Sequence, residues 1–123
     1  MEIWGSGTPR REFLHVDDLA DACVFLMKTY SEHEHINVGS GEDIAIIDLA
    51  RLVCDVVGFT GQLTRDTSKP DGTSRKLMSG ARLRALGWAP AIGLAQGIAD
   101  TYAGYLATLA QRSPAQAAPP RTA

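Results

Sequence analysis

Long apolar runs are missing from this sequence of 123 residues. No stretch approaches the roughly 20 apolar residues that a membrane span needs, and no signal-peptide pattern is present. We therefore expect no membrane association and a cytoplasmic location. The length suits one domain-sized unit with an ordinary hydrophobic core.

Cysteine and metal-ligand clusters are scarce as well. The two cysteines, Cys23 and Cys54, each fall within a helical apolar pattern. In a cytosolic protein this placement favours buried free thiols over a disulfide. His33 and His35 lie in a Ser/Glu/His segment without cysteine ligands, so we expect no metal site.

Basic residues are few in the first part of the chain. Residues 1–50 contain ten acidic and three basic residues, whereas residues 51–123 contain four acidic and nine basic residues. Six of these nine lie in residues 65–84. This segment is either a solvated basic face or a binding site for a phosphate-bearing ligand. Nucleic acid is disfavoured because aromatic residues are not interleaved there and the whole chain is acidic.

Apolar periodicity predicts helices over residues 16–30, 46–57 and 82–86, and a last helix that begins after Gly93. The first has an apolar face at Leu19, Ala22, Cys23, Leu26 and Met27, and Asp17 and Asp18 suit its capped start. Short strands are predicted over residues 12–16, 36–38 and 62–65. Residues 1–112 form the expected domain, and the Pro-rich residues 113–123 form an expected disordered tail.

Two polar, turn-rich motifs stand out. Residues 4–22 read WGSGTPRREFLHVDDLADA, in which a flexible turn and an arginine pair precede a strand-to-helix junction. These features suit an anion site. Residues 69–78 read KPDGTSRKLM, inside a polar segment of residues 66–80 broken by Pro70 and Gly72. A segment of this length without regular structure is usually functional or disordered.

Both motifs resemble the extended short-chain dehydrogenase/reductase superfamily and, within it, the GDP-L-fucose synthase family. The resemblance covers about residues 2–111, with departures at Ala45, where Ser or Thr is common, at Ser74, where proline is usual, and at residues 79–81. It implies an α/β fold that is α+β-like in this fragment. It further implies a C-terminal substrate-binding lobe, mostly helical with short strands, without the N-terminal Rossmann half.

The resemblance also implies which residues bind the ligand, a GDP-sugar. Arg11 and Lys76 match positions that bind its phosphates, Trp4 a position that covers a flat face, and Asp71 a position that accepts hydroxyl hydrogen bonds. The simpler interpretations are a core tryptophan, surface cations and a turn-forming aspartate. Neither a cofactor-binding nor a metal residue is implied here.

Enzymes of this family bind NADP through a Gly-rich turn and use a Ser-Tyr-Lys arrangement, and they are expected to be homodimers. Here none of Tyr30, Tyr102 and Tyr105 has a lysine four residues later, and Gly39-Ser40-Gly41 lacks a third glycine. We therefore expect no catalytic residue and no activity from this chain alone. Two alternatives stay open: a non-catalytic nucleotide-sugar-binding module, and part of another NAD(P)-dependent nucleotide-sugar epimerase or dehydratase.

Overall fold

The computed structural model describes residues 1–111, so the tail predicted for residues 113–123 lies outside the described residues. Helices and short strands are mixed along the chain, in agreement with the predicted α/β class. In order they are β1 (Glu2–Trp4), β2 (Arg10–Glu12), α1 (Val16–Thr29), β3 (Asp43–Ala45), α2 (Ile46–Val57), β4 (Thr64–Asp66), β5 (Arg75–Lys76), α3 (Ala81–Ala85) and α4 (Leu94–Gln111).

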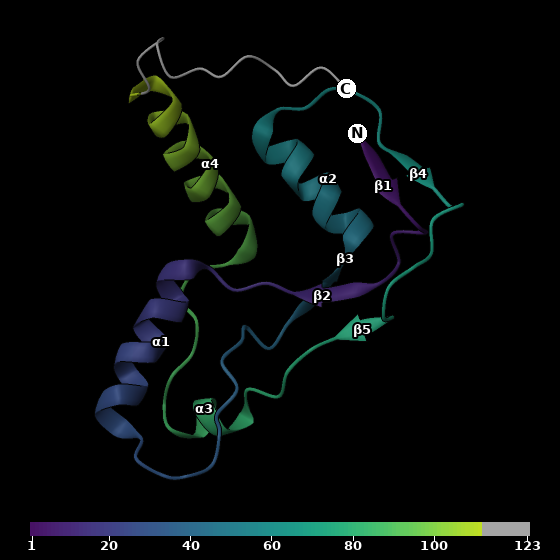
Figure 1. Cartoon of the computed structure of the whole chain (residues 1–123). Helices are drawn as coiled ribbons and strands as arrows, with labels where there is room; N and C mark the ends of the chain where they lie inside the picture. Colours follow the sequence, from purple (N-terminus) through teal and green to yellow (C-terminus); the bar gives the residue numbers. More distant parts are fainter. Residues whose placement is uncertain (112–123) are drawn as a thin grey trace.

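The strands form two small sheets. One pairs β1 with β4 in parallel, and the other has the order β3-β2-β5, with β3 antiparallel and β5 parallel to the central strand β2. In Figure 1, α2 and α4 lie on one side of β2, and α1 and α3 lie on the other. The sheet of β2 therefore runs between two helical parts of the chain.

Helix boundaries follow local signals closely. Helix α2 covers the predicted residues, and Gly58 ends it in the left-handed conformation at φ 70°. Helix α1 also begins as predicted, but its N-cap is His15, whose Nδ1 accepts the backbone N–H of Asp17 at 3.3 Å. Neither Asp17 nor Asp18 is the cap. Asp18 is instead buried, and its carboxylate accepts the backbone N–H groups of Ala91 and Ile92 at 3.1 and 3.0 Å.

The strand predictions were less accurate. The strand expected over residues 12–16 is not formed beyond Glu12: β2 covers Arg10–Glu12, because β5 pairs with it as far as Arg11 and β3 as far as Glu12. The strand expected over residues 36–38 is not formed; Ile36 and Val38 pack against the core instead. Strands β1, β3 and β5 were not predicted, since two or three residues are too few to show a period of two.

The hydrophobic core between α1 and α3, in the lower part of Figure 1, is centred on Ala22, Leu83 and Trp88. Trp88 is buried as predicted, and its indole N–H donates to Asp21 at 2.8 Å. The rest of the predicted apolar face of α1 is less buried, and Met27 is 85% exposed. The two thiols are free as expected, but only Cys54 is buried, so the prediction for Cys23 was wrong. Within residues 1–111, helices fall short of the length and apolarity that crossing a membrane requires.

Candidate anion-binding site

Arg11 and Lys76, from the two sequence motifs, are direct register partners on the parallel strands β2 and β5. Register partners in a sheet point to the same face, because side chains alternate with a period of two. Figure 1 shows β5 running beside β2. The fold thus places the two cations predicted to bind phosphate next to each other.

The cations on the opposite face of the same strands are already paired with a carboxylate. Arg10 and Arg75 are also register partners, and the Asp43 carboxylate bridges them. Arg10 Nε donates to one Asp43 oxygen at 2.7 Å, and Arg75 Nε donates to the other. The Asp43 side chain is only 4% exposed, and hydrogen bonds from Arg10 and then Arg75 hold its pKa below the usual value. This face therefore has a structural role.

Arg11 is oriented by backbone oxygens instead of a carboxylate. Its Nη1 donates to the carbonyl oxygens of Arg10 and Thr73, both at 2.7 Å. Among the described residues, no carboxylate forms an ion pair with Arg11 or Lys76. Nε and Nη2 of the half-buried Arg11 therefore keep donors for an external anion, on a guanidinium whose orientation is fixed.

Asp71 joins the second motif to the first. Its carboxylate accepts the backbone N–H of Ser6 at 2.8 Å and the Ser6 hydroxyl at 2.6 Å. These bonds, the hydroxyl first, lower the pKa of Asp71. Gly5 lies directly against this carboxylate with φ +81°, so an added Cβ would collide with Asp71 Oδ1. The contact requires glycine for both reasons.

Trp4 ends β1 with its side chain 70% exposed, which excludes the interpretation of a core tryptophan. Lys69 Nζ lies 5.5 Å from the centroid of its ring. Ser6, two residues after Trp4 in the turn that follows β1, donates hydrogen bonds to Asp71 and so places the Asp71 loop near Trp4. Sequence reasoning missed Ser6, Thr73 and Lys69, because a serine between glycines, a backbone carbonyl and a loop lysine carry no distinctive signal.

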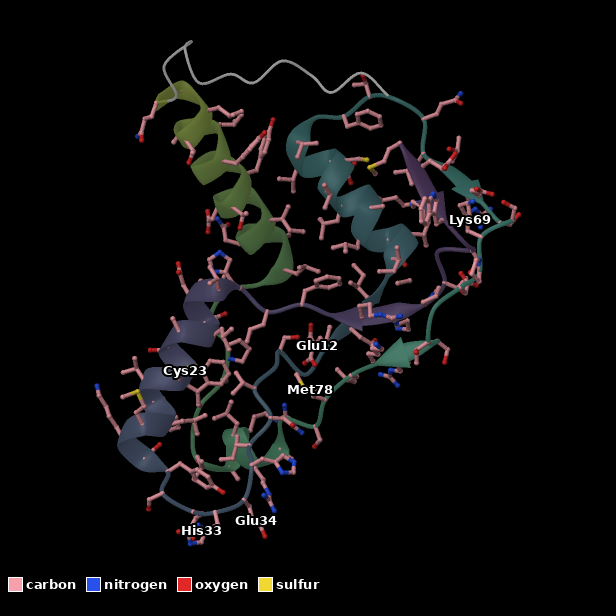
Figure 2. All side chains as sticks on the ribbon, in the orientation of Figure 1. Glu12, Cys23, His33, Glu34, Lys69 and Met78 are labelled. Atoms are coloured by element: carbon pink, nitrogen blue, oxygen red, sulfur yellow. The ribbon has the colours of Figure 1, made fainter. Side chains whose placement is uncertain are left out.

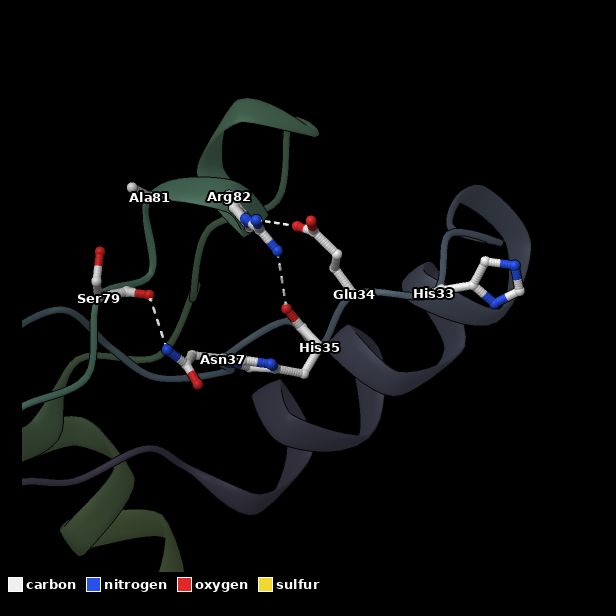
Figure 3. A pocket seen from close by; sticks show the side chains of 7 residues that line it. All are labelled: His33, Glu34, His35, Asn37, Ser79, Ala81 and Arg82. Atoms are coloured by element: carbon white, nitrogen blue, oxygen red, sulfur yellow. Dashed lines mark hydrogen bonds and ion pairs between the residues drawn. The ribbon is translucent and has the colours of Figure 1, made fainter.

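A hollow with one arginine lies where the segment of residues 33–37 meets the start of α3 (Figure 3). Arg82 is its cation, but Glu34 pairs with Arg82, and the His35 carbonyl accepts a further bond from Arg82 at 3.2 Å. Its histidines do not form a metal-binding group, since no cluster of three suitable side chains occurs among residues 1–111. This hollow is therefore the weaker candidate for an anion site.

Comparisons with known proteins agree with the motifs. The sequence model of the NAD dependent epimerase/dehydratase family matches residues 1–39. The chain is 60% identical over 110 residues to "Putative GDP-L-fucose synthase 2" of Arabidopsis thaliana, covering 89% of this chain and 34% of that protein. It is 48% identical over 113 residues to "GDP-L-fucose synthase" of Escherichia coli, covering 85% of this chain and 35% of that protein.

Among solved structures, a GDP-L-fucose synthetase from Naegleria fowleri bound to NADP matches with a TM-score of 0.83 and 30% identity. The match covers 89% of this chain and 35% of that one. The predicted resemblance to GDP-L-fucose synthases is confirmed. The chain spans about a third of the length of the relatives it matches.

Proposed function

We propose that this chain is the C-terminal substrate-binding portion of an NADP-dependent GDP-L-fucose synthase, which epimerises and reduces GDP-4-keto-6-deoxymannose to GDP-L-fucose. The sequence identity to GDP-L-fucose synthases over nearly the whole chain supports the parent activity. The coverage of only a third of those proteins supports its being a part, whose remainder is the Rossmann half. The parent enzyme is proposed to be a cytoplasmic homodimer, as the family resemblance implies.

One observation carries the proposal for the binding site: Arg11 and Lys76 share a sheet face, and no carboxylate in residues 1–111 pairs with either of them. On the other face, Asp43 pairs with both arginines. A diphosphate supplies the missing negative charge. The fixed guanidinium of Arg11 can present a donor pair to phosphate oxygens, and such charge-assisted bonds contribute roughly 1.5–3 kcal/mol each. Lys76 adds a point charge beside it.

Trp4 and Asp71 complete the proposed site. The exposed indole of Trp4 offers a flat apolar face to a base or sugar, with its N–H as a donor. Asp71 has a double role. It fastens the loop to Ser6, and because a carboxylate has about four lone-pair sites, it keeps acceptor capacity for a sugar or ribose hydroxyl.

The Gly-x-Gly turn at residues 39–41 does not fit the pyrophosphate of NADP. The glycine pair at residues 39–41 follows no strand, and Glu12 occupies it: Glu12 Oε1 accepts the Gly41 backbone N–H at 2.6 Å, and a Cβ on Gly39 would collide with the same oxygen. A carboxylate in this position takes the donor and the space that a pyrophosphate needs. We therefore propose that NADP binds in the rest of the parent enzyme.

Calorimetry with GDP-mannose tests the substrate assignment. Because only part of the cleft is present, we expect a dissociation constant in the millimolar range, about −4 kcal/mol, weakened by added salt. Arg11→Ala should abolish this binding, whereas Arg51→Ala, which removes an exposed arginine on α2, should not change it. Equal binding by the Arg11→Ala variant, or no binding by the unaltered chain, would count against the proposal. GDP and UDP, which differ only in the base, serve as the comparison for base preference.

A further inference from the structure

Lys69 lies over the ring of Trp4, with its ammonium nitrogen 5.5 Å from the ring centroid. The residue belongs to the loop that follows β4, and Figure 2 shows it beside the ends of β1 and β4. Trp4 and Asp66 are register partners on these two strands. The contact is therefore made where the first motif and the basic loop meet.

The backbone that carries Lys69 is fixed by a hydrogen-bonded turn. Asp66 Oδ1 accepts the backbone N–H of Ser68 at 3.0 Å and the Ser68 hydroxyl at 2.6 Å. The Asp66 carbonyl oxygen accepts the backbone N–H of Lys69 at 3.2 Å and that of Gly5 at 2.8 Å. The same carbonyl thus joins Lys69 to the residue that follows Trp4, so the fold holds the backbone of Lys69 beside Trp4, within reach of the ring.

No carboxylate in residues 1–111 forms an ion pair with Lys69. The five ion pairs among residues 1–111 do not include it. The acidic residues nearest to Lys69 in the sequence are engaged elsewhere: Asp66 binds Ser68, and Asp71 binds Ser6. The cation is held only by an exposed aromatic face, which is a weak interaction that a phosphate can replace.

We propose that Lys69 is a third cationic contact for the nucleoside diphosphate sugar. When the ligand covers the Trp4 ring, the Lys69 ammonium moves off the ring and binds the diphosphate. This inference rests on the proposed function and deepens it. Asp71 ties the loop of Lys69 to the turn after Trp4, and Thr73 ties the same loop to Arg11. Lys69 and Lys76, the latter on β5, therefore flank the contacts of this loop with the first motif.

The test uses the full chain and two probes, GDP and guanosine, titrated by calorimetry at low salt. Lys69→Ala should weaken GDP binding about five- to tenfold and reduce its salt dependence, because one charge-assisted contact is lost. Guanosine binding should not change. Lys28→Ala in the last turn of α1 and Arg65→Ala on β4 are controls that remove other exposed cations and should leave GDP binding unchanged. Thermal unfolding checks that the Lys69→Ala variant remains folded.

The possible failures are distinguishable. If Lys69→Ala binds GDP as the unaltered chain does while Arg11→Ala loses it, the role of Lys69 is wrong and the proposed site stands. If Lys69→Ala weakens the binding of GDP and of guanosine equally, Lys69 acts only at the Trp4 ring, and its proposed contact with the diphosphate is wrong. If Arg65→Ala loses as much GDP affinity as Lys69→Ala, the effect is one of general charge, and the proposed contact is again wrong. If the unaltered chain binds no GDP, the proposed function and this inference fail together.

Discussion

Arg11 and Lys76 are direct register partners, although more than sixty residues separate them in the sequence. Their immediate neighbours, Arg10 and Arg75, are register partners one position earlier and therefore point to the other face. The adjacent Arg10 and Arg11 thus lie on opposite faces of β2. Asp43 pairs with both arginines of one face, whereas no carboxylate in residues 1–111 pairs with the cations of the other.

Adjacent arginines should consequently give opposite phenotypes. Arg10→Ala removes the bonds to Asp43 and to the Asp43 carbonyl, so we expect the melting temperature to fall by several degrees while GDP binding is retained. Arg11→Ala should lose GDP binding with a smaller change in melting temperature. Thermal unfolding and calorimetry on both variants provide the check. Equal losses of stability and binding in the two variants would contradict the division of the two faces.

Acid should destabilise the chain through Asp43 and Asp71. The pKa of each is lowered below its model-compound value of 3.8, in Asp43 mainly by Arg10 and Arg75 and in Asp71 by Ser6. A carboxyl whose folded-state pKa is lowered contributes stability that is present above its unfolded pKa and is lost as the pH falls through its folded pKa. We therefore expect the melting temperature to fall steeply below about pH 4.

Melting curves between pH 2 and pH 7 measure this effect. The Asp43→Asn and Asp71→Asn variants should each show a flatter decline below pH 4, since the substituted group no longer titrates. Asp48→Asn is the matched control, because Asp48 is exposed and pairs only with Arg51. Identical acid slopes in all four proteins would show that these two carboxyl groups do not govern acid stability.

Gly5 and Gly58 provide a paired test of the turn that Asp71 holds. Both have positive φ, +81° and +70°, and alanine at either costs about 1–2 kcal/mol in backbone strain. Only Gly5→Ala also places a methyl group against Asp71, whereas Gly58 has open space around it. Urea unfolding should show a larger loss of stability for Gly5→Ala, together with weaker GDP binding. Equal effects would show that the contact with Asp71 contributes nothing.

How far the sequence predicted the fold depended on whether the deciding interactions were local. Helix α2 was located to the residue because its apolar period and the left-handed Gly58 are local signals. Strand β3 was missed, since Asp43 is an acidic residue that becomes nearly buried only because Arg10 and Arg75 reach it from distant strands. No local pattern records such an interaction.

The same distinction applies to the candidate site. Arg11 and Lys76 were identified through motif resemblance, which implied that both bind the phosphates of one ligand. The bonds of Asp71 to Ser6 were not expected, because a hydrogen bond between residues 65 positions apart depends on tertiary structure. The exposure of Trp4 could not be decided either, as a tryptophan beside glycines suits both a core and a surface.

Self-association is a further expectation. An apolar groove lies between α2, α4 and the connection from β2 to α1, and its lining includes Phe13, Val16 and Tyr105. Val16 is 67% and Tyr105 57% exposed, so much of this lining faces solvent. Exposed apolar surface of this kind favours association with another surface. We expect binding of a hydrophobic dye and a mass that increases with protein concentration in light scattering.

Two variants test whether this groove is responsible. Tyr105→Ser should reduce both dye binding and association. Met27→Ser, which removes an even more exposed apolar side chain outside the groove lining, should have little effect. A strictly monomeric chain that binds no dye would argue that these residues form a complete and independent domain.

Finally, we expect that the chain alone transfers no hydride and epimerises nothing. A reductase of the proposed family needs a phenol that protonates the C4 oxygen as hydride arrives, and a lysine four residues later lowers the pKa of that phenol. None of the three tyrosines has that lysine, and the Tyr30 hydroxyl donates to the Glu34 carbonyl at 2.7 Å. The only Gly-x-Gly turn after the first helix is occupied by Glu12.

The assay mixes the purified chain with NADPH and GDP-4-keto-6-deoxymannose and follows the absorbance of the reduced nicotinamide. We expect the rate to equal the control without protein, while GDP still binds in a parallel calorimetric titration. Retained binding without turnover separates the site on β2 and β5 from the chemistry, which the proposal assigns to the Rossmann half. Turnover above the control would refute the proposal that this chain is only the substrate-binding portion, because it would require a proton donor and a cofactor site within these residues.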